Sequence, residues 1–252
     1  MFRRIIIFYV LIWFFLMLLG GVQQATGIVP VEIGLAQWGP GIAAILMLVI
    51  FRRDGFKITF FSRDLPALRY LYAVLLPLGV GLIVYLLRFL MQIKSAAVPG
   101  IIDNLPLTLL WLPLGAIGEE IGWRGYLHKK LDPHMRGLFS SLLVGLLWMP
   151  IHVHFLAQSP VYLFFFALMI MSYSVVIYAL VQDTGFNVLL ATIFHLAINL
   201  ANLVFLDVIY QTTFMIINSL VWVVLAVIVI TMKRELFLTK KMKPLSNASS
   251  QI

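Results

Sequence analysis

The chain has 252 residues, of which 62% are hydrophobic and only 11% are charged. Soluble domains carry about 25% charged residues, so this composition predicts a protein that crosses a membrane several times and has almost no soluble domain. The absence of cysteine excludes a thiol nucleophile, a cysteine-bound metal and a disulfide. The net charge of +8 does not indicate nucleic-acid binding, because the basic residues follow the expected membrane topology.

Eight hydrophobic segments approach the length of about 20 residues that a helix needs to span a bilayer. The first follows Met1-Phe2-Arg3-Arg4 and has no small-residue cleavage site after it, so we expect a retained helix rather than a signal peptide. The chain is therefore predicted to fold as an all-α, polytopic transmembrane helical bundle of about eight helices. We place these helices at residues 5–22, 33–51, 70–92, 104–128, 137–153, 160–181, 187–206 and 213–232.

These helices divide the chain into three parts. Residues 1–103 contain the first three helices and a cytoplasmic loop, and residues 104–206 contain the next four helices. Residues 207–252 contain the last helix and a basic tail. We expect the middle part to carry the function, because the unusual polar residues lie there.

Basic residues cluster on one side of the predicted membrane, and only Arg88 and Lys94 fall near the other. The positive-inside rule makes the richer side cytoplasmic, and an even number of helices then places both termini inside. We expect an integral, multi-pass protein of the cell membrane. The basic residues assigned to the cytoplasmic side are Arg3, Arg4, Arg52, Arg53, Lys57, Arg63, Arg69, Arg124, Lys129, Lys130, Arg136, Lys233, Arg234, Lys240, Lys241 and Lys243.

The cytoplasmic segment 52–69 mixes aromatic and basic residues, so we expect it to lie along the inner membrane surface. An ordinary loop held near anionic lipid and a segment that gates substrate entry are both compatible with its composition. The tail from Leu236 onward is short and polar, and we expect it to be disordered.

Five residues that can take part in catalysis lie inside the apolar segments. Ionisable groups are costly at membrane depth, so they are rare there and by default mark a functional site. Together the five provide a carboxylate base, imidazoles and an amide, which are the groups needed to activate water against a peptide bond. These residues are Glu119, Glu120, His152, His195 and Asn199.

The two adjacent glutamates are expected to have different roles. Neighbouring helical residues point about 100° apart, and Arg124 follows Glu120 by four residues, the spacing at which an acid and a base meet on one helix face. That pair would be structural, whereas Glu119 would face elsewhere and act as a general base in an apolar cavity. The alternative is that all three residues cap the helix at the membrane interface.

The histidines lie on two further helices. His152 follows Trp148 by four residues and Pro150 by two, and an interfacial histidine near the outer leaflet is the alternative. His195 and Asn199 share one helix face roughly 12 Å below the cytoplasmic start of their helix, where a helix–helix hydrogen bond is the alternative. Glu119 lies at a similar depth, but the helix length would carry His152 toward the far side unless its helix is tilted or starts late.

Other hydrolytic chemistries find little support in the sequence. It contains no Gly-x-Ser-x-Gly elbow and no His-Glu-x-x-His pair. A pair of intramembrane aspartates is also missing, since Asp103, Asp183 and Asp207 all fall at predicted helix ends.

Three motifs in order resemble those of a known family. Glu-Glu-x-x-x-Arg at 119–124, an aromatic-x-x-x-His at 148–152 and His-x-x-x-Asn at 195–199 resemble the CPBP, or Abi, family. This family comprises the type II CAAX prenyl proteases and the bacteriocin-processing or immunity proteins. The family usually has Phe where this chain has Trp148, and the glycine that typically follows the arginine is present as Gly125.

The resemblance implies that residues 104–206 form a catalytic core of the CPBP type. It implies that Glu119 and His152 activate the attacking water. His195 and Asn199 would then steady the developing oxyanion or hold that water.

The resemblance also implies supporting residues and raises the question of a metal. Glu120 and Arg124 would organise their helix, and Trp148 would support the site. The family is often regarded as metalloproteases, and one carboxylate with two imidazoles is compatible with a zinc ion that has an open position. We favour a metal-free route with a glutamate base, because an amide suits an oxyanion donor better than a zinc ligand. The residues that would bind zinc are Glu119, His152 and His195.

The sequence thus predicts an intramembrane endopeptidase that cleaves a membrane-associated peptide or protein. A non-catalytic immunity or binding protein of the same fold is the first alternative. A transporter that uses Glu119 and the histidines as a proton relay is the second, although the chain shows no internal repeat.

Overall fold

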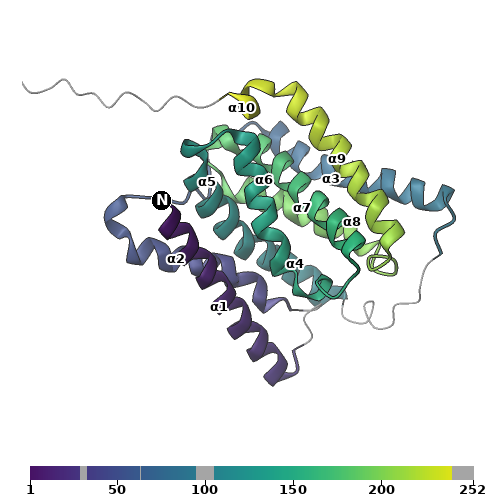
Figure 1. Cartoon of the computed structure of the whole chain (residues 1–252), viewed down its shortest axis with the longest axis horizontal. Coiled ribbons are helices and arrows are strands. Elements are labelled where there is room, and N and C mark those ends of the chain that lie inside the picture. Colours follow the sequence, from purple (N-terminus) through teal and green to yellow (C-terminus); the bar gives the residue numbers. More distant parts are fainter. Residues whose placement is uncertain (29–32, 63, 95–104, 240–252) are drawn as a thin grey trace, which may run out of the picture.

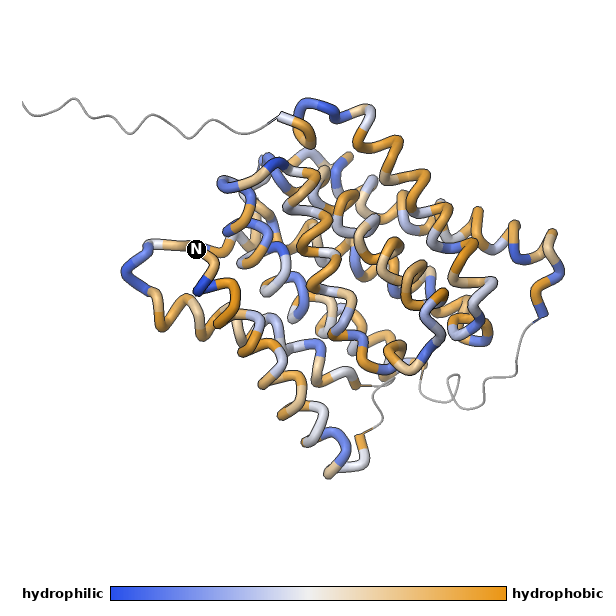
Figure 2. Tube along the Cα trace, viewed as in Figure 1, coloured by the Kyte–Doolittle hydropathy of each residue, from blue (hydrophilic) through white to orange (hydrophobic). Residues whose placement is uncertain are grey.

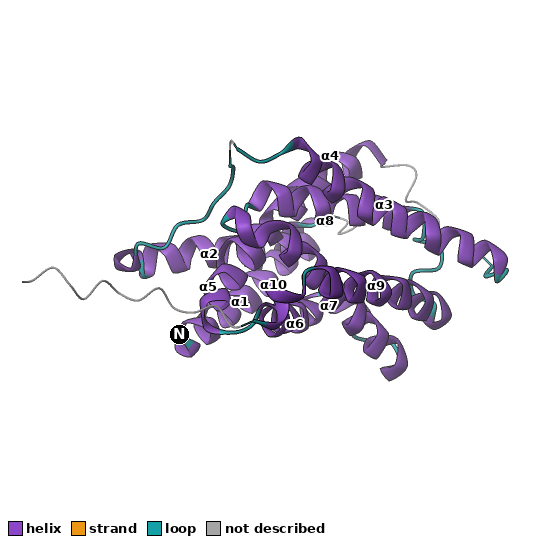
Figure 3. Cartoon of the chain, turned by 90° about the horizontal axis from the view of Figure 1, so that it is seen from above, coloured by secondary structure: helices purple, strands orange, loops and turns teal. Residues whose placement is uncertain are grey.

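The computed structural model describes residues 1–28, 33–62, 64–94 and 105–239, and within these ranges it contains helices and no β-strand (Figures 1 and 3). The predicted all-α fold is therefore confirmed. The α-helices are α1 (Phe2–Thr26), α2 (Gly39–Ile50), α3 (Ala67–Leu90), α4 (Leu105–Glu120), α5 (Lys129–Leu131), α6 (Gly137–Trp148), α7 (Pro160–Val181), α8 (Val188–Leu203), α9 (Thr212–Met232) and α10 (Arg234–Leu238). The shorter helices are η1 (Leu35–Trp38), η2 (Arg52–Asp54), the π-helix η3 (Ile121–His128), η4 (Asp132–His134), η5 (Met149–Ile151), η6 (Val153–Phe155) and η7 (Gln182–Thr184).

Each of the eight predicted hydrophobic segments coincides with a helix. Four helices of the described residues are long and apolar enough to cross a membrane: α1, α3, α7 with η7, and α9. The segments 35–50, 137–151 and 188–203 are shorter apolar helices. Apolar colouring runs along most of α1 and α9, whereas hydrophilic residues gather at the turns (Figure 2). The chain is an integral, multi-pass membrane protein built as a helical bundle.

The central helices form two layers with the polar residues between them. Viewed from above, α3, α4 and α8 form one layer, and α6, α7 and α9 form the second (Figure 3). In the first layer α8 packs on α3 and α4, and in the second α7 packs on α6 and α9. Helices α1 and α2 pack on each other at one side of the bundle, and α2 also packs on α4 and η3 (Figure 1).

The start of α2 lies against α4 and η3 with almost no side chain between them. A Cβ atom on Gly122 would lie 2.6 Å from the carbonyl carbon of Pro40, and one on Gly41 would lie 2.6 Å from the carbonyl oxygen of Gly118. Any side chain at these two glycines would overlap backbone atoms. This contact fixes the distance from α2 to the helix that carries Glu119.

Helix α6 is shorter than the predicted segment 137–153. Its 12 residues end at Trp148 and correspond to about 18 Å. Pro150 then interrupts the backbone hydrogen bonding, and the chain continues as the single turn η5. His152 follows directly with a non-helical backbone (φ −81°, ψ 62°). The short helix keeps His152 near the level of Trp148 instead of carrying it to the far side.

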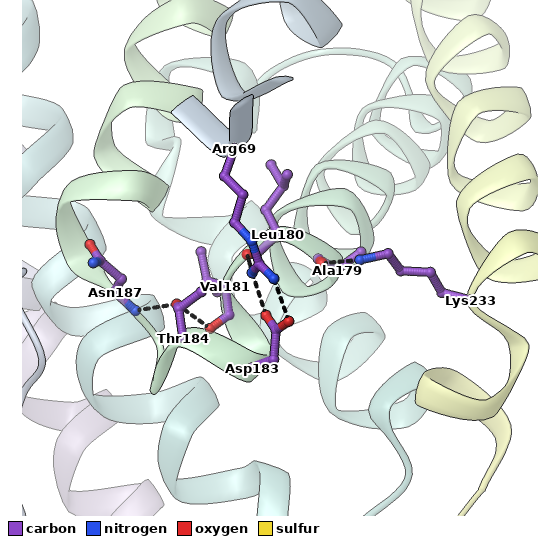
Figure 4. A network of polar contacts seen from close by, with 8 residues as sticks. All are labelled: Arg69, Ala179, Leu180, Val181, Asp183, Thr184, Asn187 and Lys233. Atoms are coloured by element: carbon purple, nitrogen blue, oxygen red, sulfur yellow. Dashed lines mark hydrogen bonds and ion pairs between the residues drawn. The ribbon is translucent and has the colours of Figure 1, made fainter. Parts of the chain in front are cut away.

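Two cations cap the carboxyl end of α7 (Figure 4). The Arg69 guanidinium donates one hydrogen bond of 2.6 Å to each carboxylate oxygen of Asp183, and its Nη1 donates to the Leu180 carbonyl at 3.3 Å. The Lys233 ammonium donates to the Ala179 carbonyl at 2.9 Å. Because the carboxyl end of a helix carries partial negative charge, both cations stabilise it. They tie the start of α3 and the end of α9 to the end of α7.

Further ion pairs follow the division of charge predicted from the sequence. Asp54 pairs with Arg4 at the start of α1 and with Lys130 in α5, the latter at 3.4 Å. At the opposite end of α3, Arg88 pairs with Asp207. The basic segments distant in sequence therefore meet at one end of the bundle.

The chain between η2 and α3 attaches to the start of α8. The Val188 amide donates to the Thr59 carbonyl at 2.9 Å, and the Lys129 ammonium donates to the Thr59 hydroxyl at 2.9 Å. The Thr59 carbonyl therefore accepts a hydrogen bond from one of the backbone amides that the start of a helix leaves unpaired. Phe60 and Phe61 remain 49% and 59% exposed. The position of this segment beside the membrane surface stays a prediction.

The prediction that the tail is disordered from Leu236 onward is wrong for its first residues. Leu236 lies in α10, and Phe237 is fully buried with its ring centroid 5.5 Å from that of Tyr178. One buried aromatic residue in a polar segment produces no hydrophobic periodicity, so the sequence pattern did not reveal this contact. Residues 240–252 of the predicted tail lie outside the described residues.

Candidate active site

Glu119 is held by an indole. It lies at the end of α4 with only 3% of its surface exposed, and its Oε2 accepts a 2.6 Å hydrogen bond from Nε1–H of Trp148 at the end of α6. Its Oε1 makes no hydrogen bond with the residues that the structure describes. One carboxylate oxygen is thus fixed across the two helix layers, and the other is available to a ligand.

Glu120 points to a different set of partners. Its Oε1 accepts a 2.7 Å hydrogen bond from Nη1 of Arg124, so the ion pair predicted from the four-residue spacing is present. The same oxygen lies 2.9 Å from Nδ1 of His195 on α8. Glu120 and Arg124 are fully buried, and His195 is 4% exposed. These residues do not cap a helix at an exposed end but join η3 to α8 inside the bundle.

The backbone hydrogen bond of His152 fixes its tautomer. Its Nδ1 lies 3.2 Å from the carbonyl oxygen of Trp148. A carbonyl oxygen can only accept, so Nδ1 carries the hydrogen and Nε2 has a free lone pair. The ring also packs edge-on against Phe166 of α7, with 5.4 Å between centroids.

Trp148 lies at the centre of these groups. The guanidinium carbon of Arg124 is 4.3 Å from the centroid of its ring, within the range of a cation–π contact. The ring centroid lies 5.2 Å from that of His195 and 5.9 Å from that of His152. Four of the predicted residues therefore meet around one indole, although they come from different helices.

Asn199 is the predicted site residue with the weakest attachment. It lies one turn after His195 on α8, as the sequence predicts, and is partly buried. Its amide makes no hydrogen bond with the other described residues. An unbound amide one turn from His195 is free to donate to a ligand.

The sequence reasoning missed three features of this site. The helix that carries both glutamates changes to a π-helix directly after Glu120, and such distortions occur often at functional sites. The contacts of Trp148 with Glu119 and of His195 with Glu120 were also missed. The π-helix contains Gly122 and Gly125, and glycine lowers helix propensity, but their spacing does not by itself predict a π-helix.

The described residues do not form the three-ligand zinc site that the resemblance raised. Among the described residues, no group of three or more His, Asp or Glu side chains is placed to hold a metal ion. A structural or catalytic zinc ion needs at least three protein ligands, and this requirement is not met by the described donors.

Comparison with known proteins agrees with the motifs. Residues 101–201 match the sequence model of the family described as "Type II CAAX prenyl endopeptidase Rce1-like", and this segment contains all three motifs. The match confirms the resemblance that the motifs indicated.

Two relatives named "Lysostaphin resistance protein A", from two strains of Staphylococcus epidermidis, are each 28% identical to the chain over 212 residues. The alignment covers 80% of this chain and 54% of each relative. The chain spans about half the length of the curated relatives it matches.

Proposed function

Starting from the match of residues 101–201 to type II CAAX prenyl endopeptidases, we propose that this membrane protein is an intramembrane endopeptidase. Its substrate is a membrane-associated peptide or protein, and Glu119 is the base that activates water. The observation that supports this proposal most is the hydrogen bond from Trp148 to Glu119, which leaves Oε1 of a buried carboxylate available, while the His152 and His195 rings lie next to the same indole.

The first step is the attack of water on the scissile carbonyl carbon. Oε1 of Glu119 removes one proton from the water, and the lone pair on Nε2 of His152 accepts a hydrogen bond from its second hydrogen. The water oxygen forms the new bond to carbon, and the carbonyl electrons move onto oxygen. The two groups thereby orient the nucleophile and take up its proton.

The second step stabilises the oxyanion and releases the products. The Asn199 amide donates to the oxyanion, and the protonated form of His195, held at Nδ1 by the Glu120 carboxylate, donates from Nε2. The proton on Glu119 then passes to the leaving nitrogen as the carbon–nitrogen bond breaks. The products are a carboxylic acid and an amine, and Glu119 returns to its ionised form.

The proposal includes the location of the protein. The basic segments meet at the end of the bundle that holds Arg4, Arg69 and Lys233. The positive-inside rule assigns this end to the cytoplasm, with both termini inside and the chain in the cell membrane.

N-terminal peptide profiling tests the activity in cells. Cells that express the wild-type protein are compared with cells that express Glu119→Gln at the same level, and Glu235→Gln serves as the matched control because Glu235 is exposed on α10. New peptide termini should appear with wild type and Glu235→Gln and should be absent with Glu119→Gln. Identical termini in all three strains contradict the proposal.

The name of the relatives supports a second candidate, a membrane protein that confers resistance or immunity by binding rather than by cleavage. This candidate predicts that Glu119→Gln keeps full protection in cells. The profiling strains distinguish the two candidates, since loss of protection together with loss of the new termini supports the protease.

A further inference from the structure

We propose that Trp148 is a positioning residue, whose indole N–H holds the Glu119 carboxylate in the orientation that the reaction needs. The inference rests on the proposed function and deepens it, because it assigns a role to a residue that does not touch the substrate. Trp148 is 1% exposed, so a substrate cannot reach its ring directly.

The hydrogen bond restrains one oxygen and thereby directs the other. Glu119 can rotate about three side-chain bonds, and a free carboxylate in an apolar environment would distribute over several rotamers. The 2.6 Å bond from Nε1 to Oε2 selects one of them, with Oε1 as the oxygen left for water. Hydrogen bonds to an ionised acceptor are about twice as strong as neutral ones, so the preference is large in a buried site.

The indole is itself held in place from several sides. The Arg124 guanidinium lies over its face with Cζ 4.3 Å from the ring centroid, and Arg124 is fixed in turn by Glu120. The rings of His195 and Tyr173 lie 5.2 Å and 6.5 Å from that of Trp148 between centroids. The direction of the N–H is therefore set by packing on both helix layers.

Phenylalanine at position 148 separates the hydrogen bond from the packing. Trp148→Phe keeps an aromatic ring under Arg124 but removes the donor, and Oε2 of Glu119 loses its described partner. We expect kcat to fall by roughly 10- to 100-fold. KM should change less than about twofold, because the substrate does not contact this side chain.

Trp123 offers a matched control. It is a fully buried tryptophan of η3 next to Trp148, and its Nε1 has no hydrogen-bond partner among the described residues. Trp123→Phe removes the same atoms from the same region without removing a donor to Glu119. It should leave kcat unchanged.

The kinetic experiment uses a quenched fluorogenic peptide built on a cleavage site found by the N-terminal profiling. Purified wild-type protein, Trp148→Phe and Trp123→Phe are compared in detergent micelles. A selective fall of kcat in Trp148→Phe supports the inference. Equal kcat in Trp148→Phe and wild type, or equal losses in both variants, overturns it.

A second experiment needs no substrate. The six tryptophans of ¹⁵N-tryptophan-labelled protein give indole N–H resonances in heteronuclear NMR, and the phenylalanine variants assign two of them. Glu119→Gln replaces an ionised acceptor by a neutral one, so the Trp148 resonance should move upfield while the Trp123 resonance stays in place. If the chemical shift of the Trp148 indole N–H is the same in Glu119→Gln as in wild type, the inference is overturned. If wild type cleaves nothing while the resonance responds, the proposed function fails and the hydrogen bond stands.

Discussion

Oε1 of Glu120 lies 2.9 Å from Nδ1 of His195, and 2.7 Å from Nη1 of Arg124. One carboxylate oxygen therefore joins the π-helix after α4 to the histidine of α8. The adjacent Glu119 turns to α6 instead, where Trp148 binds it. Two neighbouring glutamates thus bind side chains of two different helices, α6 and α8. Substitutions at the two positions should therefore have different effects on stability and on cleavage.

Removing the cation of the buried pair should destabilise the protein strongly. Arg124→Met leaves the fully buried Glu120 carboxylate without its ion partner, and the loss of one member of a buried pair costs about 3–5 kcal/mol of unfolding free energy. Denaturant unfolding in detergent micelles measures the change. The matched control is Arg69→Met, since the pair of Arg69 and Asp183 is partly exposed and should contribute about 0–1 kcal/mol. Equal losses in the two variants contradict the buried pair as a main source of stability.

Glycine should be required where α2 meets the helix of the glutamates. Gly122→Ala places a Cβ atom 2.6 Å from the carbonyl carbon of Pro40, so the backbones must separate and the Glu119 carboxylate must move. We expect reduced thermal stability and loss of cleavage. Gly79→Ala on α3 is the control, because its Cβ atom meets nothing within 4 Å. Normal cleavage by Gly122→Ala would show that this contact does not position the site.

The amide of Asn199 is expected to act on the oxyanion. Asn199→Ala should lower kcat by about 100-fold with little effect on KM, in line with the removal of one oxyanion donor. Asn202→Ala, three residues later on α8, should retain normal kcat. Steady-state kinetics of the two purified variants measure the difference. A loss confined to KM would assign Asn199 to substrate binding instead.

Zinc should not be required for the reaction. We expect purified active protein to contain well below one zinc ion per chain by elemental analysis and to keep its activity after dialysis against a chelator. The reason is that no group of three or more His, Asp or Glu side chains among the described residues is placed to hold a metal ion. One zinc ion per chain that disappears in His152→Ala would contradict the metal-free route.

Much of the fold could be predicted from the sequence because lipid imposes a simple rule. A membrane-spanning backbone must satisfy its hydrogen bonds internally, so long apolar runs become helices. The eight apolar runs predicted helices at the observed positions, and most predicted helix ends lie within a few residues of the observed ends. Helix α6 ends at Trp148 and not at the predicted residue 153, because Pro150 interrupts the backbone hydrogen bonding, and an apolar run does not by itself mark such an end.

The site could be predicted only where its contacts follow helical spacing. The pair of Glu120 and Arg124 lies within one helix, and its four-residue separation revealed it. Trp148 and Glu119 are 29 residues apart, and Glu120 and His195 are 75 apart, so no local pattern encodes their contacts. The π-helix lies where the α2 backbone approaches Gly122, and this contact also involves residues distant in sequence.

The most direct test of the account is cleavage by purified protein in proteoliposomes. The peptide identified by profiling is incubated with wild type, Glu119→Gln or Glu235→Gln, and mass spectrometry follows its two fragments. The account predicts fragments with wild type and with Glu235→Gln, and none with correctly folded Glu119→Gln. Cleavage by Glu119→Gln at the wild-type rate would contradict the role of Glu119 as the base that activates water.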